Sequence, residues 1–172
     1  SVQREHVAKE DAAAPTVALE SVFVTATIEA KEKWEVVTID IPGAFLHADN
    51  DDYVIMKMNG SLAELMVKTD PKIYRKYVTI EKGRQVLYLR LQKALYGMMK
   101  SALLFYRKLV KELKEMGFEI NPYDPCVANK LVSGKQMTVR WHVDDLMISH
   151  IDKSEILKFV RCIKDIYGDN LT

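Results

Sequence analysis

The sequence predicts an α+β domain in which helices cover one face of a mostly antiparallel sheet. Apolar residues at helical spacing alternate along the chain with β-branched runs of strand length. The turn residues Ser133-Gly-Lys135 join two such runs, and a short connection of this kind produces an antiparallel pair. The 172 residues correspond to one domain by the usual size of roughly 150 residues, and 48% of them are apolar, which is enough for a sizeable core.

The elements are expected in the order helix, strand, mixed insertion, helix, a series of strands and a final helix. Helical spacing of apolar residues predicts the long helices at 17–31, 101–116 and 153–167. Extended patterns predict strands at 34–40, 118–120, 126–132, 136–142 and 146–149. The insertion is expected to hold short strands at 53–57 and 86–90 and short helices at 62–66 and 71–77.

Several element boundaries have a local cause in the sequence. Pro42-Gly43 stops the strand that ends at Asp40, because proline cannot donate to a sheet and glycine favours a turn. Gly117 is expected to end the helix before it. Asp152-Lys-Ser-Glu155 resembles a capping box and predicts the start of the last helix.

Composition excludes several classes of protein. The 25 Lys and Arg nearly balance the 24 Asp and Glu, and with only 7 Gly and 5 Pro the chain is neither disordered nor collagen-like. No apolar run approaches the roughly 20 residues that cross a bilayer, and the polar start is unlike a signal peptide. We therefore expect an intracellular protein with no membrane partner. Cys126 and Cys162 lie far apart and are expected to be small core residues.

Basic residues are concentrated in one stretch of the chain. Residues 72–108 contain ten Lys and Arg and one acid, Glu81, so this stretch carries +9 while the whole chain carries +1. Such asymmetry favours a polyanionic partner on one face, although a charge run is also typical of a solvated surface.

Adjacent carboxylates interrupt the extended stretch Val139–Ser149. Asp144 and Asp145 fall between two apolar strands, and the alternative to a functional site is a plain hairpin turn, which usually contains Gly or Asn. Asp40 ends another apolar strand, and its alternative role is to cap the following turn. If the strands are neighbours, three carboxylates meet at one sheet edge. Oxygen ligands of this kind suit Mg²⁺ or Mn²⁺, and two such ions can stabilise a phosphoryl transfer.

Three motifs in order resemble the reverse transcriptases of copia-type LTR retrotransposons. Asp40-Ile-Pro-Gly-Ala-Phe-Leu-His47 resembles their first catalytic motif. Leu91-Gln-Lys-Ala-Leu-Tyr-Gly97, followed by Lys100-Ser-Ala102, resembles their template- and nucleotide-contacting motif. His142-Val-Asp-Asp145 resembles their Tyr-Val-Asp-Asp motif, with His in place of Tyr. Asn121-Pro-Tyr-Asp-Pro-Cys126 extends the resemblance to roughly residues 14–170.

The resemblance implies specific roles for individual residues. Asp40, Asp144 and Asp145 would be catalytic ligands of two Mg²⁺ or Mn²⁺ ions, together with the backbone carbonyl of Ile41. Phe45 would be a steric gate against the ribose 2′-hydroxyl; its alternative is a core residue. The remaining implied contacts are Tyr96 and Gly97 with the nucleotide, and Arg90, Lys93 and Lys100 with the nucleic acid.

The function implied is an RNA-directed DNA polymerase domain that adds deoxynucleoside triphosphates to a primer on an RNA or DNA template. The fold implied is a polymerase palm with partial fingers. Because little precedes the first helix and nothing follows Thr172, we expect residues 1–172 to be a fragment of a polyprotein without its thumb and ribonuclease H domains, located in a cytoplasmic virus-like particle. The alternatives are an inactive transposon remnant, an RNA-binding module with an RRM-like sheet, and, more weakly, a metal-dependent nuclease.

Overall fold

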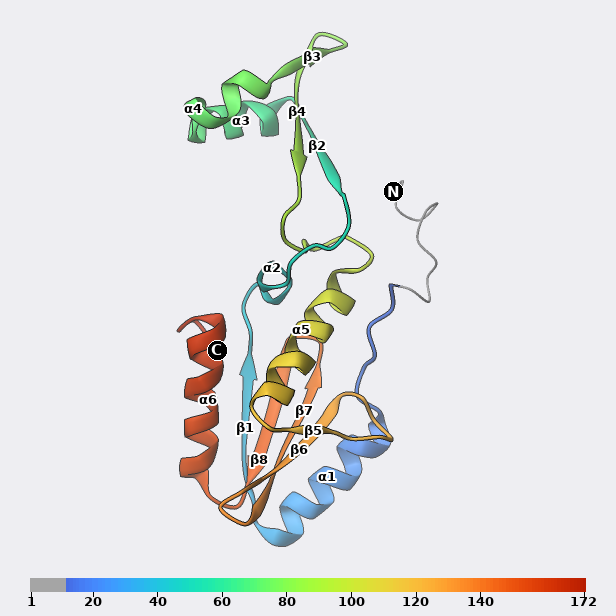
Figure 1. Cartoon of the computed structure of the whole chain (residues 1–172), viewed down its shortest axis with the longest axis vertical. Coiled ribbons are helices and arrows are strands. Elements are labelled where there is room, and N and C mark those ends of the chain that lie inside the picture. Colours follow the sequence, from blue (N-terminus) through green and yellow to red (C-terminus); the bar gives the residue numbers. More distant parts are fainter. Residues whose placement is uncertain (1–11) are drawn as a thin grey trace. The chain divides into compact units, whose positions relative to one another are not determined.

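The computed structural model describes residues 12–172, which fall into two compact units (Figure 1). Unit 1 contains the chain up to Ala48 together with Ala94–Thr172, and unit 2 contains Asp49–Lys93. The mixed insertion that the sequence predicts inside one domain therefore forms a unit with its own sheet. Among the described helices, none is both long enough and apolar enough to cross a membrane.

Unit 1 is built on a five-stranded antiparallel sheet, which confirms the predicted α+β class. The strands lie in the order β1-β8-β7-β6-β5. Their bounds are β1 Glu35–Asp40, β5 Glu119–Ile120, β6 Val127–Val132, β7 Lys135–His142 and β8 Asp145–His150. Each differs by at most two residues at either end from the range expected from the sequence. The order brings β1, early in the chain, beside β8, which directly follows the adjacent acids.

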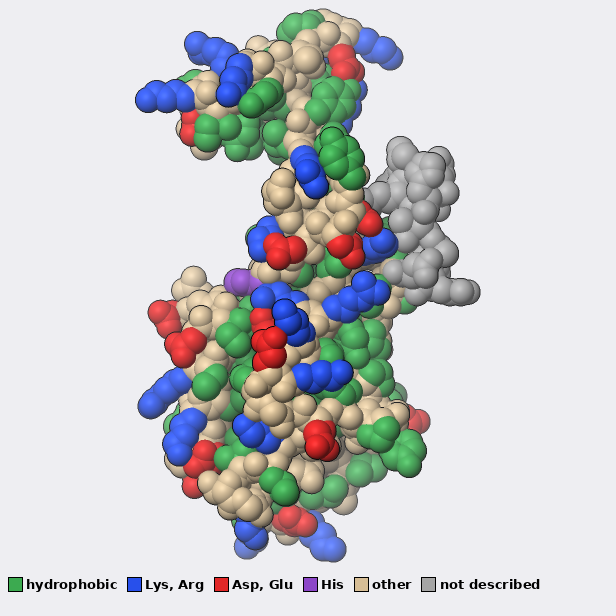
Figure 2. All heavy atoms as spheres, viewed as in Figure 1, with side chains coloured by type: hydrophobic (Ala, Val, Ile, Leu, Met, Phe, Trp, Pro, Cys, Tyr) green, Lys and Arg blue, Asp and Glu red, His purple; other side chains and the backbone are tan. Residues whose placement is uncertain are grey.

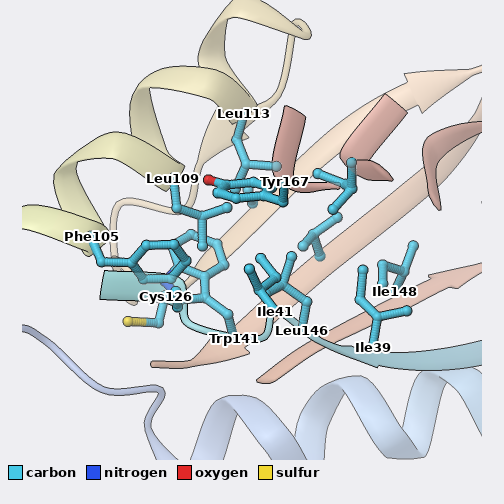
Figure 3. Close-up of a cluster of buried hydrophobic side chains, with 14 of the residues drawn as sticks. Ile39, Ile41, Phe105, Leu109, Leu113, Cys126, Trp141, Leu146, Ile148 and Tyr167 are labelled. Carbon is cyan, nitrogen blue, oxygen red and sulfur yellow. The ribbon is translucent and has the colours of Figure 1, made fainter. Parts of the chain in front are cut away.

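Helices α5 (Ser101–Glu115) and α6 (Lys153–Tyr167) cover one face of this sheet and enclose the core. Leu109 and Leu113 of α5 and Ile156 and Ile163 of α6 are fully buried. They pack with strand residues that share one face of the sheet, among them Ile39, Leu146 and Ile148 (Figure 3). Burying apolar surface in this cluster is the main favourable contribution to folding.

Helix α1 (Leu19–Glu32) covers the opposite face, so the prediction that all long helices share one face is wrong. Figure 3 shows α1 on the far side of the strands from the buried cluster. An ion pair joins α1 to the sheet: Arg140 of β7 donates to both carboxylate oxygens of Glu29 on α1, at 2.6 and 3.0 Å. Both side chains are buried. Apolar spacing places a helix against a sheet but does not say against which face.

Local signals explain the helix boundaries. The Asp152 side chain accepts from the backbone N–H of Ser154 at 2.8 Å and caps α6, as the sequence predicts. Gly117 follows α5 with φ 85°. After β1, the short helix α2 (Ala44–His47) begins behind Gly43, which has φ 64°. The sequence did not predict this helix, because four residues are too few for a periodic pattern.

Unit 2 is a small three-stranded antiparallel sheet with short helices. Its strands lie in the order β2-β4-β3, and the sequence did not predict β3 because three residues give little pattern. The strands are β2 Ile55–Asn59, β3 Thr79–Glu81 and β4 Arg84–Arg90; the helices are α3 Ser61–Thr69, α4 Pro71–Tyr74 and the 3₁₀ turn Arg75–Tyr77. Asp70 caps α4 by accepting from the N–H of Ile73 at 3.1 Å.

Candidate active site

Asp40 and Asp145 are direct partners in the ladder between β1 and β8. The N–H of Asp40 points away from β8 and donates to the carbonyl of Thr172 at 2.8 Å, whereas the N–H of Ile41 donates to the carbonyl of Asp144 at 3.2 Å. Asp40 and Asp145 are therefore a non-hydrogen-bonded pair, in which Cα atoms are about 4.5 Å apart and side chains lie on the same face. Two carboxylates from distant parts of the sequence meet at one end of the sheet.

Asp144 lies in the two-residue turn between β7 and β8. His142 pairs with Asp145, so Val143 and Asp144 form the turn. Val143 has φ 59° while Asp144 has a negative φ, which is the type II′ pattern that normally requires glycine first. A β-branched residue in this region is strained. The hairpin turn that was the alternative to a functional site is therefore present. Its backbone is strained at Val143, and its second residue, Asp144, is an acid.

Tyr96 connects Asp144 to the loop before α5. Its hydroxyl donates to the Asp144 carboxylate at 3.3 Å. Partial desolvation, the charge of Asp144 and the hydrogen bond to it, together with the charge of Asp40, raise the pKa of Tyr96 above its usual value. Both carboxylates thus lie close enough to act on one phenol. Gly97 follows with φ 93°, and a side chain there would meet no atom but would be strained.

Phe45 stands between this loop and the core. Its ring centroid is 4.3 Å from that of Tyr96 and 6.5 Å from that of Phe105 in α5. Phe45 is 9% exposed, whereas Tyr96 is 57% exposed. The structure therefore places Phe45 in the core and, at the same time, beneath the aromatic ring that reaches Asp144. The alternative of a core residue is confirmed, whereas the role of Phe45 as a steric gate against the ribose 2′-hydroxyl stays a prediction.

The carbonyl of Ile41 accepts from the N–H of Ala44 at 3.2 Å, at the start of α2. A carbonyl oxygen has two lone pairs, so this bond leaves one for another ligand. Ile41 itself is fully buried. Ile41 directly follows Asp40, and its N–H is hydrogen-bonded to the carbonyl of Asp144. The Ile41 carbonyl that is expected to bind a metal ion therefore lies at the same end of the sheet as the acids.

The acids fit a divalent metal in type and backbone position but are not arranged around one point. Within residues 12–172, no group of at least three His, Cys, Asp or Glu side chains is gathered so that it could hold a metal ion. Asp144 accepts from Tyr96, and Asp40 lies 3.5 Å from the hydroxyl of Thr172. The hydrogen bond from Tyr96 uses one of the two carboxylate oxygens of Asp144 and leaves the other able to accept a ligand. Carboxylate oxygens are the donors that Mg²⁺ and Mn²⁺ prefer.

The expected nucleic-acid contacts fall in both units. Lys93 forms an ion pair with Asp49 at 2.7 Å, and the Arg90 guanidinium lies 5.0 Å from the ring centroid of Tyr53; all four residues belong to unit 2. Lys100 directly precedes α5 in unit 1. A polyanionic partner for the basic stretch 72–108 stays a prediction.

Sequence reasoning missed two contacts at this site. The Tyr96–Asp144 hydrogen bond joins residues 48 positions apart, and the pairing of Thr172 with Asp40 joins residues 132 positions apart. Neither has a local signal, because each depends on which strands and loops become neighbours. The left-handed backbone of Val143 had only an indirect signal: a two-residue turn without Gly or Asn must place another residue there.

The two motifs that contain Asp40 and Asp145 meet at this carboxylate-bearing end of the antiparallel sheet. The chain matches the model of the family described as "Reverse transcriptase (RNA-dependent DNA polymerase)" over residues 1–168. The chain therefore belongs to the reverse transcriptase family. This result confirms the resemblance inferred from the motifs.

Among curated proteins, the chain is similar to the "Retrovirus-related Pol polyprotein from transposon TNT 1-94" of Nicotiana tabacum. The two are 24% identical over 157 residues, which cover 91% of this chain and 10% of the relative. The chain thus spans about a tenth of the length of this relative. No solved structure matches the chain.

Proposed function

We propose that this chain carries the polymerising site of an RNA-directed DNA polymerase from a retrotransposon Pol polyprotein, with unit 1 as the palm and unit 2 as part of the fingers. The reaction is attack of a primer 3′-hydroxyl on the α-phosphate of a deoxynucleoside triphosphate. The primer hydroxyl loses its proton to solvent, a bond forms between the primer oxygen and the α-phosphorus, the bond from that phosphorus to the bridging oxygen breaks, and pyrophosphate leaves. The observation that carries the proposal is the Asp40–Asp145 pair with Asp144 adjacent to it.

The carboxylates of Asp40, Asp144 and Asp145 are the proposed ligands of two Mg²⁺ or Mn²⁺ ions, with the Ile41 carbonyl as a further ligand. When bound, such ions neutralise phosphate charge and stabilise both the attacking and the leaving oxygen. Close carboxylates repel one another, so a cation at this end of the sheet also relieves an unfavourable interaction. The ladder fixes Asp40 against Asp145 before any ligand arrives, which reduces the conformational cost of binding.

Residues around the acids have positioning roles in this proposal. The exposed ring of Tyr96, with Gly97 allowing close backbone approach, contacts the incoming nucleotide. Phe45 supports that ring from the core and limits the space for a ribose 2′-hydroxyl. Lys93, Lys100 and Arg90 contact phosphates of the template-primer, an interaction that gives affinity without reading sequence. The proposed partners also include other domains of the polyprotein, and the proposed setting is a virus-like particle.

Primer extension by single nucleotides tests the proposal. The chain, extended by its flanking polyprotein segments, is incubated with a primer-template, deoxynucleotides and either Mg²⁺ or Mn²⁺. Asp144→Asn is expected to lower the rate by at least about 10³-fold without unfolding the protein, since charge stabilisation is usually the largest catalytic contribution. Asp165→Asn, an exposed acid on α6, is the matched control and is expected to extend primers at the parent rate.

Two results would argue against the proposal. An Asp144→Asn variant that extends primers like the parent would show that this carboxylate has no catalytic role. A parent protein that makes no DNA with either metal ion would favour the inactive remnant, and binding of RNA in that protein would favour a binding module.

A further inference from the structure

Helix α1 presents large apolar side chains to solvent. Leu19 is 70% exposed, Phe23 is 67% exposed and Val24 is 59% exposed. A helix that packs on a sheet normally turns its apolar residues towards the sheet and its polar residues outwards. In the view of Figure 2, hydrophobic side chains reach the surface at the lower right of unit 1, where Figure 1 places α1. Neighbouring apolar side chains on a surface are typical of an interaction site.

Much of the side of α1 that faces the sheet is polar instead. Thr25 and Glu29 are four residues apart, and both accept from the Arg140 guanidinium of β7. Glu32, seven residues after Thr25, continues this side of the helix. Turning the apolar residues inwards would leave the buried charge of Arg140 without its carboxylate partner, which is unfavourable. The ion pair therefore holds the apolar residues of α1 on the outside.

The outer side of α1 carries one charge near each end and apolar groups between them. It holds Glu20, Phe23, Thr27 and Lys31, which follow one another at intervals of three or four residues. Glu20 lies in the first turn and Lys31 in the last turn. The Thr27 hydroxyl donates back to the carbonyl of Phe23 at 2.7 Å, so its methyl group is the part that faces outwards. All four side chains are exposed.

This side of α1 is complementary to itself when two copies of the helix lie antiparallel. The pair Glu20–Lys31 and the pair Phe23–Thr27 are both centred on the middle of the helix. A two-fold axis at that point sets Glu20 of each copy against Lys31 of the other, and Phe23 against Thr27. A parallel arrangement would set like charges against each other at both ends. Self-complementarity of this kind is what a two-fold interface requires.

We propose that the outer side of α1 binds a second copy of this chain, with the two α1 helices antiparallel. A helix of 14 residues offers a strip about 21 Å long and roughly 10 Å wide, which is less than the ~800 Å² per partner of a stable interface. The dimer is therefore weak, with an expected Kd on the order of tens of micromolar. The contact uses none of the residues of the proposed catalytic site, so the inference goes beyond the proposed polymerase function.

Sedimentation equilibrium of the full 172-residue chain tests the inference. The protein is studied without nucleic acid from about 1 µM to about 300 µM, a range that brackets the expected Kd. A reductant keeps the exposed thiol of Cys162 from joining two copies through a disulfide. The average mass is expected to rise with concentration from 19.7 kDa towards twice that value.

One substitution at the centre of the contact tests whether α1 forms it. Phe23→Glu is expected to raise the Kd at least about tenfold, because a carboxylate placed in an apolar contact loses its water. Leu157→Glu is the matched control, since Leu157 is 45% exposed on α6, which covers the other face of the sheet. This control is expected to dimerise like the parent. Circular dichroism checks that both variants keep the fold.

Charge reversal tests the antiparallel direction. Glu20→Lys and Lys31→Glu each create two like-charge pairs across the proposed contact, and each is expected to raise the Kd by roughly fivefold. An equal mixture of the two variants restores two pairs of opposite charge. The mixture is therefore expected to dimerise more tightly than either variant alone and within about twofold of the parent.

Several outcomes would overturn the inference. A parent that stays monomeric at the highest concentration would favour another segment of the polyprotein as the occupant of this side of α1. Parent-like dimerisation by Phe23→Glu, or an equal loss in Leu157→Glu, would place the contact elsewhere. A mixture of the two charge variants that dimerises no better than either alone would exclude the antiparallel pair. Each of these results leaves the catalytic proposal standing, because primer extension depends on Asp144.

Discussion

The hydroxyl of Tyr96 holds the carboxylate of Asp144 through a hydrogen bond of 3.3 Å. This contact competes with a metal ion for one carboxylate oxygen of Asp144, a proposed metal ligand. Tyr96→Phe removes the hydroxyl and keeps the ring on Phe45, so we expect divalent ions to bind tighter. The expected gain is roughly fivefold in Kd, which corresponds to about 1 kcal/mol for a partly exposed hydrogen bond.

Calorimetric titration with Mn²⁺ measures this effect in the absence of nucleotide. Tyr106→Phe is the matched control, because it also loses one hydroxyl, which donates to the carbonyl of Pro125 at 3.1 Å away from the acids. The idea fails if Tyr96→Phe and Tyr106→Phe bind Mn²⁺ with the same affinity.

Phe45 is expected to control sugar selection. Phe45→Ala in the polymerising protein should raise incorporation of ribonucleotides relative to deoxynucleotides by roughly tenfold, equivalent to about 1.4 kcal/mol of lost discrimination. Because Phe45 is 9% exposed and packs in the core, the same change should cost about 3–5 kcal/mol of stability. Phe105→Leu, which alters a neighbouring buried ring, is the control for destabilisation. Unchanged sugar preference in Phe45→Ala would leave Phe45 with a purely structural role.

The buried ion pair of Arg140 and Glu29 should be costly to break. Glu29→Ala leaves the Arg140 guanidinium buried without its carboxylate partner, and we expect a loss of about 3–5 kcal/mol in the free energy of unfolding. Glu20→Ala, an exposed acid on the same helix, should cost no more than about 1 kcal/mol. Urea unfolding followed by circular dichroism compares the two. Equal losses would show that α1 is not attached through this pair.

The two cysteines should differ in reactivity. Burial, and secondarily the charge of Asp124, raises the pKa of the Cys126 thiol to about 12. The thiolate is the reactive form, so at about pH 8 Cys126 is almost entirely protonated as well as inaccessible. Cys162 is exposed. A thiol-reactive dye should therefore label Cys162 alone in the folded protein and both residues in denaturant. Labelling of Cys126 in the folded Cys162→Ser variant would contradict this burial.

Much of unit 1 could be predicted from the sequence because its elements carry strong local patterns. The helix predicted at 153–167 matches α6, with its cap at Asp152, and the strand predicted at 34–40 matches β1 within one residue. The expectation for Cys126 as a buried residue is confirmed, whereas Cys162 is exposed and that expectation is wrong. The apolar pattern predicts which face of a helix is buried, but it does not decide the burial of a single residue at the border of that face, such as Cys162.

The remaining features depend on which elements become neighbours. The buried pairing of Glu29 on α1 with Arg140 has no signal in the sequence, where Glu29 looks like any surface residue. The sequence suggested that Asp40 and the pair at 144–145 could meet, and the β1–β8 register brings Asp40 against Asp145. The sequence did not indicate the hydrogen bond between Tyr96 and Asp144, because contacts between residues 48 positions apart leave no periodic pattern.

Binding of Mn²⁺ by the three acids tests the central claim most directly. Electron paramagnetic resonance counts the bound ions in the presence of a primer-template and a deoxynucleoside triphosphate. The parent should bind about two ions, as a two-metal site requires. The variants Asp40→Asn, Asp144→Asn and Asp145→Asn should each lose at least one ion, whereas Asp165→Asn should lose none. If Asp40→Asn and Asp144→Asn both bind Mn²⁺ with the number and affinity of the parent, the carboxylates at this end of the sheet are not metal ligands.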